Sequence, residues 1–155
     1  MASRINFENS NDIGVFVKLT NQYALVAAGG SEAIYRSFES ELKTIPVIPM
    51  SIAGMKIVGR MVVGNKNGLL VPDSITDEEM EVLKNTLPKE IKVQKLDEKL
   101  SALGNCIVCN DRVALIHPEL DEESEVKIAE VLNVEVYRQT IAGNPLVGSY
   151  CVLTN

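Results

Sequence analysis

Tryptophan, histidine and long apolar segments are scarce or missing in this sequence. It has no tryptophan, one histidine and three cysteines among 155 residues. No apolar run approaches the roughly 18 to 20 residues that a membrane-spanning helix requires. The N-terminal stretch MASRIN lacks the apolar core of a signal peptide, so we do not expect secretion. These absences favour a reducing compartment, in which the cysteines stay as free thiols.

Positive charge is scarce as well. The 21 acidic residues outnumber the 15 basic ones, which gives a net charge of −6, and no Lys/Arg cluster is longer than two residues. Because phosphate contacts dominate nucleic-acid affinity and need positive charge, we do not expect a broad RNA- or DNA-binding surface. If the partner is a ribonucleoprotein, the chain should contact a basic protein component of it. The length predicts one domain with a real core.

What the sequence does contain is an internal repeat of roughly 45 residues. An apolar residue followed by glycine recurs at spacings of 45, 45 and 44, at Ile13-Gly14, Val58-Gly59, Leu103-Gly104 and Val147-Gly148. Asparagines recur at spacings of 44, 45 and 45, at Asn21, Asn65, Asn110 and Asn155. The repeat divides the chain into units of approximately 1–57, 58–102 and 103–146, with the start of a fourth at 147–155.

Each unit predicts the order strand, turn, strand, helix, strand, which is an α+β pattern. The glycines are expected to allow close backbone approach, and the asparagines to form hairpin turns. Thr76 and Glu79 have the spacing of a helix capping box. Third strands are expected at 45–48, 91–94 and 134–137. The apolar stripes of the three helices are predicted to be Ile34, Phe38 and Leu42, then Met80, Leu83 and Leu87, then Val126, Ala129 and Leu132.

One such unit cannot bury both its helix stripe and its sheet face, so neighbouring units must cover them. A ring of units would close on itself. The fourth unit breaks off after the run VGSYCVL, which we expect to be an exposed apolar strand edge. The pattern therefore indicates a piece of a longer, closed protein.

Several stretches carry a resemblance to a known family. They are FENSNDIGVFVKLTNQYALVAAGGSE, SIAGMKIVGRMVVGN, GLLVPDSITDEE, LSALGN, CNDRVALIHPELD and VEVYRQT with LVGSYCVLTN. In order and spacing they resemble the eukaryotic translation initiation factor 6 family of ribosomal anti-association factors. The resemblance implies a pentein-type (β/α-propeller) fold, a pseudo-fivefold ring of ββαβ units. Residues 1–155 would then be a single, incomplete pentein-type domain with three units and the opening strand of the fourth.

The resemblance also implies a function without enzymatic activity or cofactors. The family binds the large (60S) ribosomal subunit at its intersubunit face, against a basic protein near the sarcin–ricin loop, and prevents association with the small (40S) subunit. It takes part in ribosome biogenesis and accompanies the pre-large subunit from the nucleolus to the cytoplasm. An elongation-factor-like GTPase releases it with the Shwachman–Bodian–Diamond protein. A monomer with little direct RNA contact and no membrane association is implied.

The residues after each repeated glycine are the candidate ribosome-binding residues. In a ring, equivalent positions project on one face, and here they differ in type, which suits an asymmetric partner. The matching positions in the family face the ribosome. Each also has an ordinary structural reading: a solvated strand residue for Arg60, a turn for Asn105, a core position for Tyr150. The candidates are Val15, Arg60, Asn105, Ser149 and Tyr150.

The remaining motifs give weaker indications of function. Cys106 and Cys109 have CxxC spacing, but there is no second pair, and in a strand they would point to opposite faces, so no metal site is expected. His117 precedes Pro118 and is interpreted as a turn residue. Pentein enzymes that modify guanidinium groups use a cysteine nucleophile and a histidine, which leaves a deiminase or amidinotransferase as an alternative function. A generic interaction scaffold is a third possibility.

Overall fold

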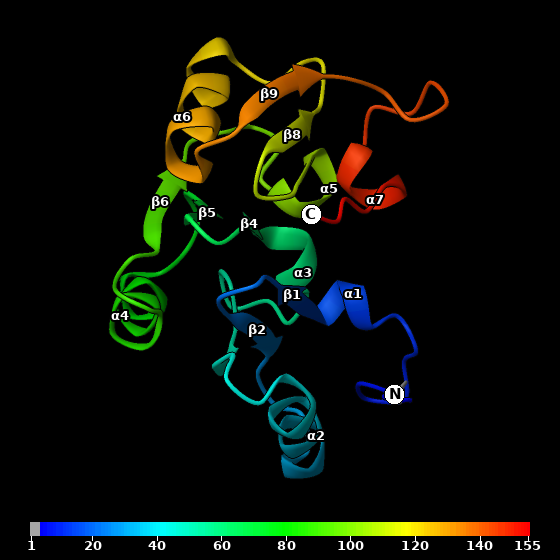
Figure 1. Cartoon of the computed structure of the whole chain (residues 1–155), viewed down its shortest axis with the longest axis vertical. Helices are drawn as coiled ribbons and strands as arrows, with labels where there is room; N and C mark the ends of the chain where they lie inside the picture. Colours follow the sequence, from blue (N-terminus) through cyan, green and yellow to red (C-terminus); the bar gives the residue numbers. More distant parts are fainter. Residues whose placement is uncertain (1–3) are drawn as a thin grey trace.

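The computed structural model describes residues 4–155 and shows the repeat as three small sheets arranged in an arc (Figure 1). Met1 to Ser3, part of the N-terminal stretch from which secretion was judged, lie outside the described residues. The long helices lie on the outside of the arc and the short helices on its inside (Figure 1). The fold is α+β, as the sequence predicted. Within residues 4–155, no helix is both long and apolar enough to cross a membrane.

Each sheet has three strands in sequence order, the first pair antiparallel and the second parallel. The parallel pair requires a crossover, and a long helix provides it in every unit. The central strands β2 and β5 are buried along their whole length. The strands are β1 Val17–Leu19, β2 Ala24–Ala27 and β3 Val47–Met50; β4 Val63–Gly64, β5 Gly68–Pro72 and β6 Lys92–Leu96; β7 Ile107–Cys109, β8 Val113–Ile116 and β9 Glu135–Arg138.

The crossover helices are α2 Glu32–Leu42, α4 Asp77–Thr86 and α6 Glu122–Leu132. The predicted capping box begins α4: the Thr76 side chain accepts from the Glu79 N–H, and the Glu79 carboxylate accepts from the Thr76 N–H. The predicted stripe of α6 is wrong at Val126, which is 55% exposed. Its buried positions are Ser124, Ile128 and Leu132, because an i, i+4, i+8 row, and not i, i+3, i+6, faces the neighbouring sheet.

The prediction of a strand directly after each repeated glycine is also wrong. The glycine and its neighbours form a helix of one turn, and the strand begins only where that turn ends. Four apolar residues in a row do not distinguish a short helix from a strand, since periodicity needs a longer window. These short helices are α1 Ile13–Phe16, α3 Val58–Met61, α5 Leu103–Cys106 and α7 Val147–Tyr150.

The core lies at the junctions between units. One apolar cluster joins the first unit to the second, with Phe38 and Met50 on one side and Leu83 and Ile91 on the other. A second cluster joins the second unit to the third through residues such as Leu70 and Ile128. The expectation that each unit depends on its neighbours for burial therefore matches the packing.

The segment after α7 differs from the predicted opening strand of a fourth unit. Residues 151–155 form no β-ladder, and no second strand for them to pair with lies within residues 4–155. Val152 in this segment is 87% exposed. The predicted exposed apolar character is therefore present, but the strand is not, because a strand requires a hydrogen-bonded partner.

Candidate functional site

The four short helices stack around the inside of the arc, each against the next in chain order. Each begins after a residue with φ near −80° and positive ψ, a sharp bend that sets the direction of the turn. In three of the four, a hydrogen bond between residues two apart marks this bend as an inverse γ-turn. The bends occur at Asp12, Ile57, Ala102 and Leu146.

The repeated glycines permit this stacking. A Cβ added to Gly59 would clash with the carbonyl oxygen of Gly14, and one on Gly104 would clash with that of Gly59. A Cβ added to Gly148 would likewise clash with the carbonyl oxygen of Gly104, whereas one added to Gly14 would have no atom of residues 4–155 within 4 Å. The prediction of close backbone approach is thus confirmed at three of the four glycines, and the first faces open space.

The stacking brings the predicted binding residues together along one inner rim. Val15, Arg60, Asn105 and Ser149 are half-buried, and Tyr150 is 62% exposed. The Ser149 hydroxyl donates a hydrogen bond of 3.0 Å to the Asn105 side-chain oxygen, which links the third unit to the fourth. Tyr150 is therefore not a core residue, and its ring is free for contact.

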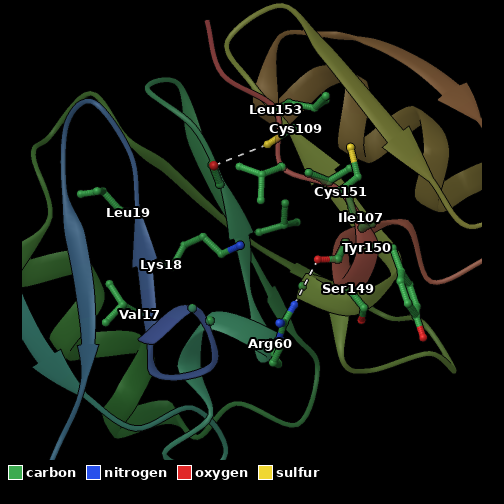
Figure 2. A pocket seen from close by; sticks show the side chains of 18 residues that line it. Val17, Lys18, Leu19, Arg60, Ile107, Cys109, Ser149, Tyr150, Cys151 and Leu153 are labelled. Carbon is green, nitrogen blue, oxygen red and sulfur yellow. Dashed lines mark hydrogen bonds between the residues drawn. The ribbon is translucent and has the colours of Figure 1, made fainter. Parts of the chain in front are cut away.

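Arg60 is more than a solvated residue. Its guanidinium donates to the carbonyl oxygen of Gly148 at 3.1 Å, across the inside of the arc (Figure 2). An arginine can pair with a carboxylate, but the partner of Arg60 within residues 4–155 is this backbone carbonyl. The remaining N–H groups of the guanidinium have no hydrogen-bond acceptor among the described residues.

Sequence reasoning missed an apolar part of this rim. Ile57 and Leu146, at the bends that begin α3 and α7, are exposed, and so is Met55 beside Ile57. In both helices an apolar pair precedes the glycine, and only its second member, Val58 or Val147, is buried. Two apolar residues in a row before the glycine could have indicated this exposed area, because the start of the short helix buries only the second of them.

A cavity of about 410 Å³ lies on the inner side of the short helices. Lys18 from β1 extends into it, and Arg60 lies at the same cavity (Figure 2). Burial lowers the pKa of Lys18, and the nearby charge of Arg60 lowers it further. The sequence alone does not indicate this role for Lys18, because the residues around it come from other units and are brought near it only by the fold.

Cys109 also lines this cavity, and its thiol donates to the carbonyl oxygen of Gly64 at 3.4 Å. Burial raises its pKa to about 11, although the charge of Lys18 opposes the shift. Cys106 belongs to α5 and packs in the second core cluster, so the two cysteines do not share a strand as assumed. Residues 4–155 contain no group of three metal-ligand side chains able to hold an ion.

His117 has the structural role predicted for it. Its Nδ1 accepts a hydrogen bond of 3.0 Å from the Glu119 N–H, and its carbonyl oxygen accepts from the Leu120 N–H. Both bonds hold the turn that follows β8. The side chain is buried there and does not line the cavity with Cys109.

At the opposite end of the strands, the turn asparagines bind two units at once. The Asn65 side-chain oxygen accepts from the Asn67 and Gly68 N–H groups, and its NH₂ group donates to the carbonyl oxygens of Asn110 and Leu132 in the next unit. Asn110 repeats this pattern, with Thr154 as its acceptor. The hairpin-turn role is confirmed for these two.

The first unit uses a different residue for the same turn. The Thr20 hydroxyl oxygen, and not the Asn21 side chain, accepts from the Gln22 and Tyr23 N–H groups, at 3.1 and 3.0 Å. Asn21 donates instead to the carboxylate of Asp111, which also accepts from the Asn155 side chain and the Lys66 N–H. The repeat was therefore read one residue late at Asn21, since a threonine hydroxyl can replace the asparagine oxygen.

Comparison with solved structures shows the fold class. The chain resembles the N-terminal domain of ArgZ, an arginine dihydrolase from the ornithine-ammonia cycle in cyanobacteria, with a TM-score of 0.56 and 14% sequence identity. The match covers 83% of this chain and 46% of that one. At this identity the likeness concerns the fold alone, and it confirms the pentein-type α+β architecture.

Comparison of sequences shows the family. Residues 2–155 match the eIF-6 family. The chain is 62% identical over its whole length to "Eukaryotic translation initiation factor 6" of Drosophila melanogaster and 60% identical to the protein of that name in Saccharomyces cerevisiae. It spans 64% of the length of each of these relatives. A family match over residues 2–155 and relatives of this identity show that the chain belongs to the eIF-6 family.

Proposed function

We propose that this chain contributes to translation by binding the large (60S) ribosomal subunit at its intersubunit face, so that the small (40S) subunit cannot join. The observation that carries the proposal is the similarity, across the whole chain, to proteins named as translation initiation factors. The proposal extends to ribosome biogenesis in the nucleolus, to export, and to release by an elongation-factor-like GTPase with the Shwachman–Bodian–Diamond protein.

The inner rim is the surface that we propose for the contact. Its short helices have the same backbone but present different side chains: a cation at Arg60, an amide at Asn105 and an exposed aromatic ring at Tyr150. Exposed Ile57 and Leu146 add apolar area at the edge. Aromatic and arginine side chains beside apolar area are typical of the residues that dominate protein interfaces.

The charge of the chain favours a protein partner over RNA. The net charge is −6, and acidic residues occupy the first turns of α4 and α6. An acidic chain approaches a basic ribosomal protein with favourable long-range attraction, whereas ribosomal RNA repels it. We therefore propose that the chain contacts a basic ribosomal protein near the sarcin–ricin loop, and not the RNA of the loop itself.

A guanidine-modifying enzyme is the second candidate, because the fold resembles an arginine dihydrolase. The cavity argues against it. A guanidinium substrate is cationic, and this cavity presents Lys18 and Arg60 but no acidic side chain among its described lining residues. Its cysteine, Cys109, has a pKa of about 11, so the thiolate that a nucleophile needs is rare at neutral pH.

Co-sedimentation with purified ribosomal subunits tests the proposal. The chain should pellet with large subunits to a saturable, equimolar level and should not pellet with small subunits. Light scattering should then show slower and less complete joining of the two subunits. The salt concentration should be varied, because an electrostatic contact weakens as ionic strength rises. A chain that stays in the supernatant with large subunits at low salt would show the proposal to be wrong.

Incubation with arginine separates the two candidates. The binding proposal expects no citrulline, ornithine or ammonia, with the cyanobacterial enzyme's domain as the positive control. Cys109→Ser provides the second arm, because it removes the one thiol aimed at the carbonyl oxygen of Gly64 in the cavity. Turnover that disappears in this variant would establish the enzyme and displace the binding proposal.

A further inference from the structure

The cavity at the inner rim has an unusual charge composition. Two of its lining side chains, Lys18 and Arg60, are cationic, and none of the lining residues within 4–155 is aspartate or glutamate. The other lining residues are glycines, apolar residues, two cysteines, a serine and a tyrosine. Two positive charges therefore share a partly open cavity that contains no negative side chain from the described part of the chain.

Lys18 has no partner for its charge. Its ammonium extends into the cavity (Figure 2), and no side-chain hydrogen bond or ion pair of Lys18 occurs within residues 4–155. Arg60 uses one of its five N–H groups, in the bond to Gly148. The site therefore has unused donors from two different elements, β1 and α3, which face the same space.

Cys109, which interacts with Lys18, and Asp111, which interacts with Cys109, do not supply a counter-charge for Lys18. Cys109 lines the cavity, but burial keeps its thiol protonated, with a pKa of about 11. The carboxylate of Asp111, at the turn end, already accepts from Asn21, Asn155 and the Lys66 N–H. An ammonium held beside a guanidinium without a counter-charge destabilises the folded chain, and a bound anion would remove that cost.

We propose that this cavity binds a small tetrahedral oxyanion of the phosphate class, held by the Lys18 ammonium and the free N–H groups of Arg60. An oxyanion offers several acceptor oxygens, and a guanidinium binds two of them in parallel while an ammonium acts as a point charge. A cavity of about 410 Å³ also leaves room for part of the hydration shell of the anion. Arg60 belongs to both the rim and the cavity, whereas Lys18 lines the cavity alone. This inference does not depend on ribosome binding, because phosphate binding is measured on the chain without ribosomes.

Thermal unfolding in inorganic phosphate tests the proposal. At constant ionic strength, replacing chloride by phosphate should raise the Tm of the chain in a saturable way, because a ligand that binds only the folded state stabilises it. Lys18→Met should weaken the apparent phosphate affinity by roughly tenfold or more, as expected for loss of a charge-assisted bond. Lys84→Met, on the exposed face of α4, is the matched control and should respond like the unchanged chain.

A second measurement does not depend on how Lys18→Met folds. In the unchanged chain with isotope-labelled lysine, NMR titration in chloride should show the pKa of Lys18 below the ordinary lysine value. Phosphate should raise the pKa of Lys18, because a bound anion favours the charged ammonium. The absence of a saturable Tm increase, an equal increase in Lys18→Met and Lys84→Met, or an unchanged Lys18 pKa in phosphate would each overturn the proposal.

Discussion

The guanidinium of Arg60 donates a hydrogen bond to the carbonyl oxygen of Gly148 and thereby connects the second unit of the repeat to the fourth. The two residues are 88 positions apart in the sequence. Gly148 is the glycine of α7, and Arg60 directly follows the glycine of α3, so the bond joins two copies of one motif. Arg60 consequently belongs both to the packing between units and to the rim that we propose as the ribosome contact.

Arg60→Glu separates these two roles. We expect a loss of stability of about 1 kcal/mol, the usual net contribution of one hydrogen bond, and a folded chain. We expect a much larger effect on ribosome binding, because a carboxylate replaces the cation on the rim. Circular dichroism with urea unfolding measures the first, and co-sedimentation with large subunits measures the second. Unchanged ribosome affinity would exclude Arg60 from the contact.

Tyr150→Ala tests the aromatic part of the rim. The ring is 62% exposed, so its removal should change the free energy of unfolding by less than about 0.5 kcal/mol. A buried aromatic contact in an interface typically contributes about 2 kcal/mol or more, so affinity for the large subunit should fall by more than tenfold. Quantitative co-sedimentation measures this loss.

Tyr137→Ala is the control for that experiment. Tyr137 is 51% exposed, but it lies on β9, away from the short helices (Figure 1). Its removal should leave ribosome affinity within about twofold of the unchanged chain, well below the hot-spot effect. If both tyrosine variants lose affinity equally, the inner rim is not the specific contact surface.

Gly104→Ala should destabilise the protein strongly. The added Cβ would clash with the carbonyl oxygen of Gly59 and lie 2.9 Å from backbone atoms of Arg60, and neither can move without shifting a helix. Overpacking of this kind costs about 1–3 kcal/mol, and backbone obstacles place it at the upper end. Urea unfolding should show a lower midpoint.

Gly14→Ala is the internal comparison, at the equivalent position of the first unit. No described residue has an atom within 4 Å of the added Cβ, and alanine is the better helix former, so stability should stay the same or rise by up to about 1 kcal/mol. Equal losses in the two variants would mean that the glycines are required for conformation and not for packing.

Asn65→Ala should cost about 2 kcal/mol or more. The side chain is buried and makes four hydrogen bonds, so its removal leaves backbone groups of two units without partners. Each unsatisfied buried group costs about 1–3 kcal/mol. Asn21→Ala, which loses one exposed bond to Asp111, should change stability by less than about 0.5 kcal/mol. Similar losses in thermal unfolding would contradict the assignment of the turn to Thr20.

Glu79→Gln should reveal a pH-dependent contribution to stability. Burial raises the pKa of the Glu79 carboxyl, but bonds from the Gly54 N–H, Ser51 hydroxyl, Thr76 N–H and Ala53 N–H outweigh it, so the pKa is lowered. The stabilisation is therefore complete above the ordinary glutamate pKa, about 4.3, and is lost as pH falls through the lower pKa of the folded state. Urea unfolding at several pH values measures it.

The variant should be less stable than the unchanged chain at neutral pH, and the difference should shrink as the pH falls below about 4. Glu78→Gln is the control, since Glu78 lies in the same first turn of α4 and is exposed. A stability difference for Glu79→Gln that does not change with pH would show that the carboxylate charge is not what binds the turn at Gly54.

The sequence predicted those parts of the fold that follow from period and chemistry. A helix of ten or eleven residues has a detectable stripe, so α2, α4 and α6 were located, and the capping box at Thr76 follows from side-chain chemistry alone. The short helices were mistaken for strands because four residues complete barely one turn. The asparagine repeat places the first turn at Asn21, whereas the hydrogen bonds show that the Thr20 hydroxyl holds that turn.

The candidate site was predictable only where the repeat itself pointed to it. Arg60, Asn105 and Tyr150 follow the repeated glycines, so the period of the repeat predicts that they lie on the same face. The cavity was not predictable, since Lys18 sits in a strand with no unusual pattern around it. Its setting depends on the neighbouring side chains of Arg60 and Cys109, which only the packing of three units brings together.

The contacts between the repeated glycines also determine how the inner surface can change. Successive short helices pack so closely that a Cβ added to Gly59 would clash with the carbonyl oxygen of Gly14, and one added to Gly104 with that of Gly59. This close approach is made by the glycine backbones and not by the side chains that line the cavity. Substitutions at lining positions such as Lys18 can therefore change the charge of the cavity while the glycine contacts that pack the short helices are kept.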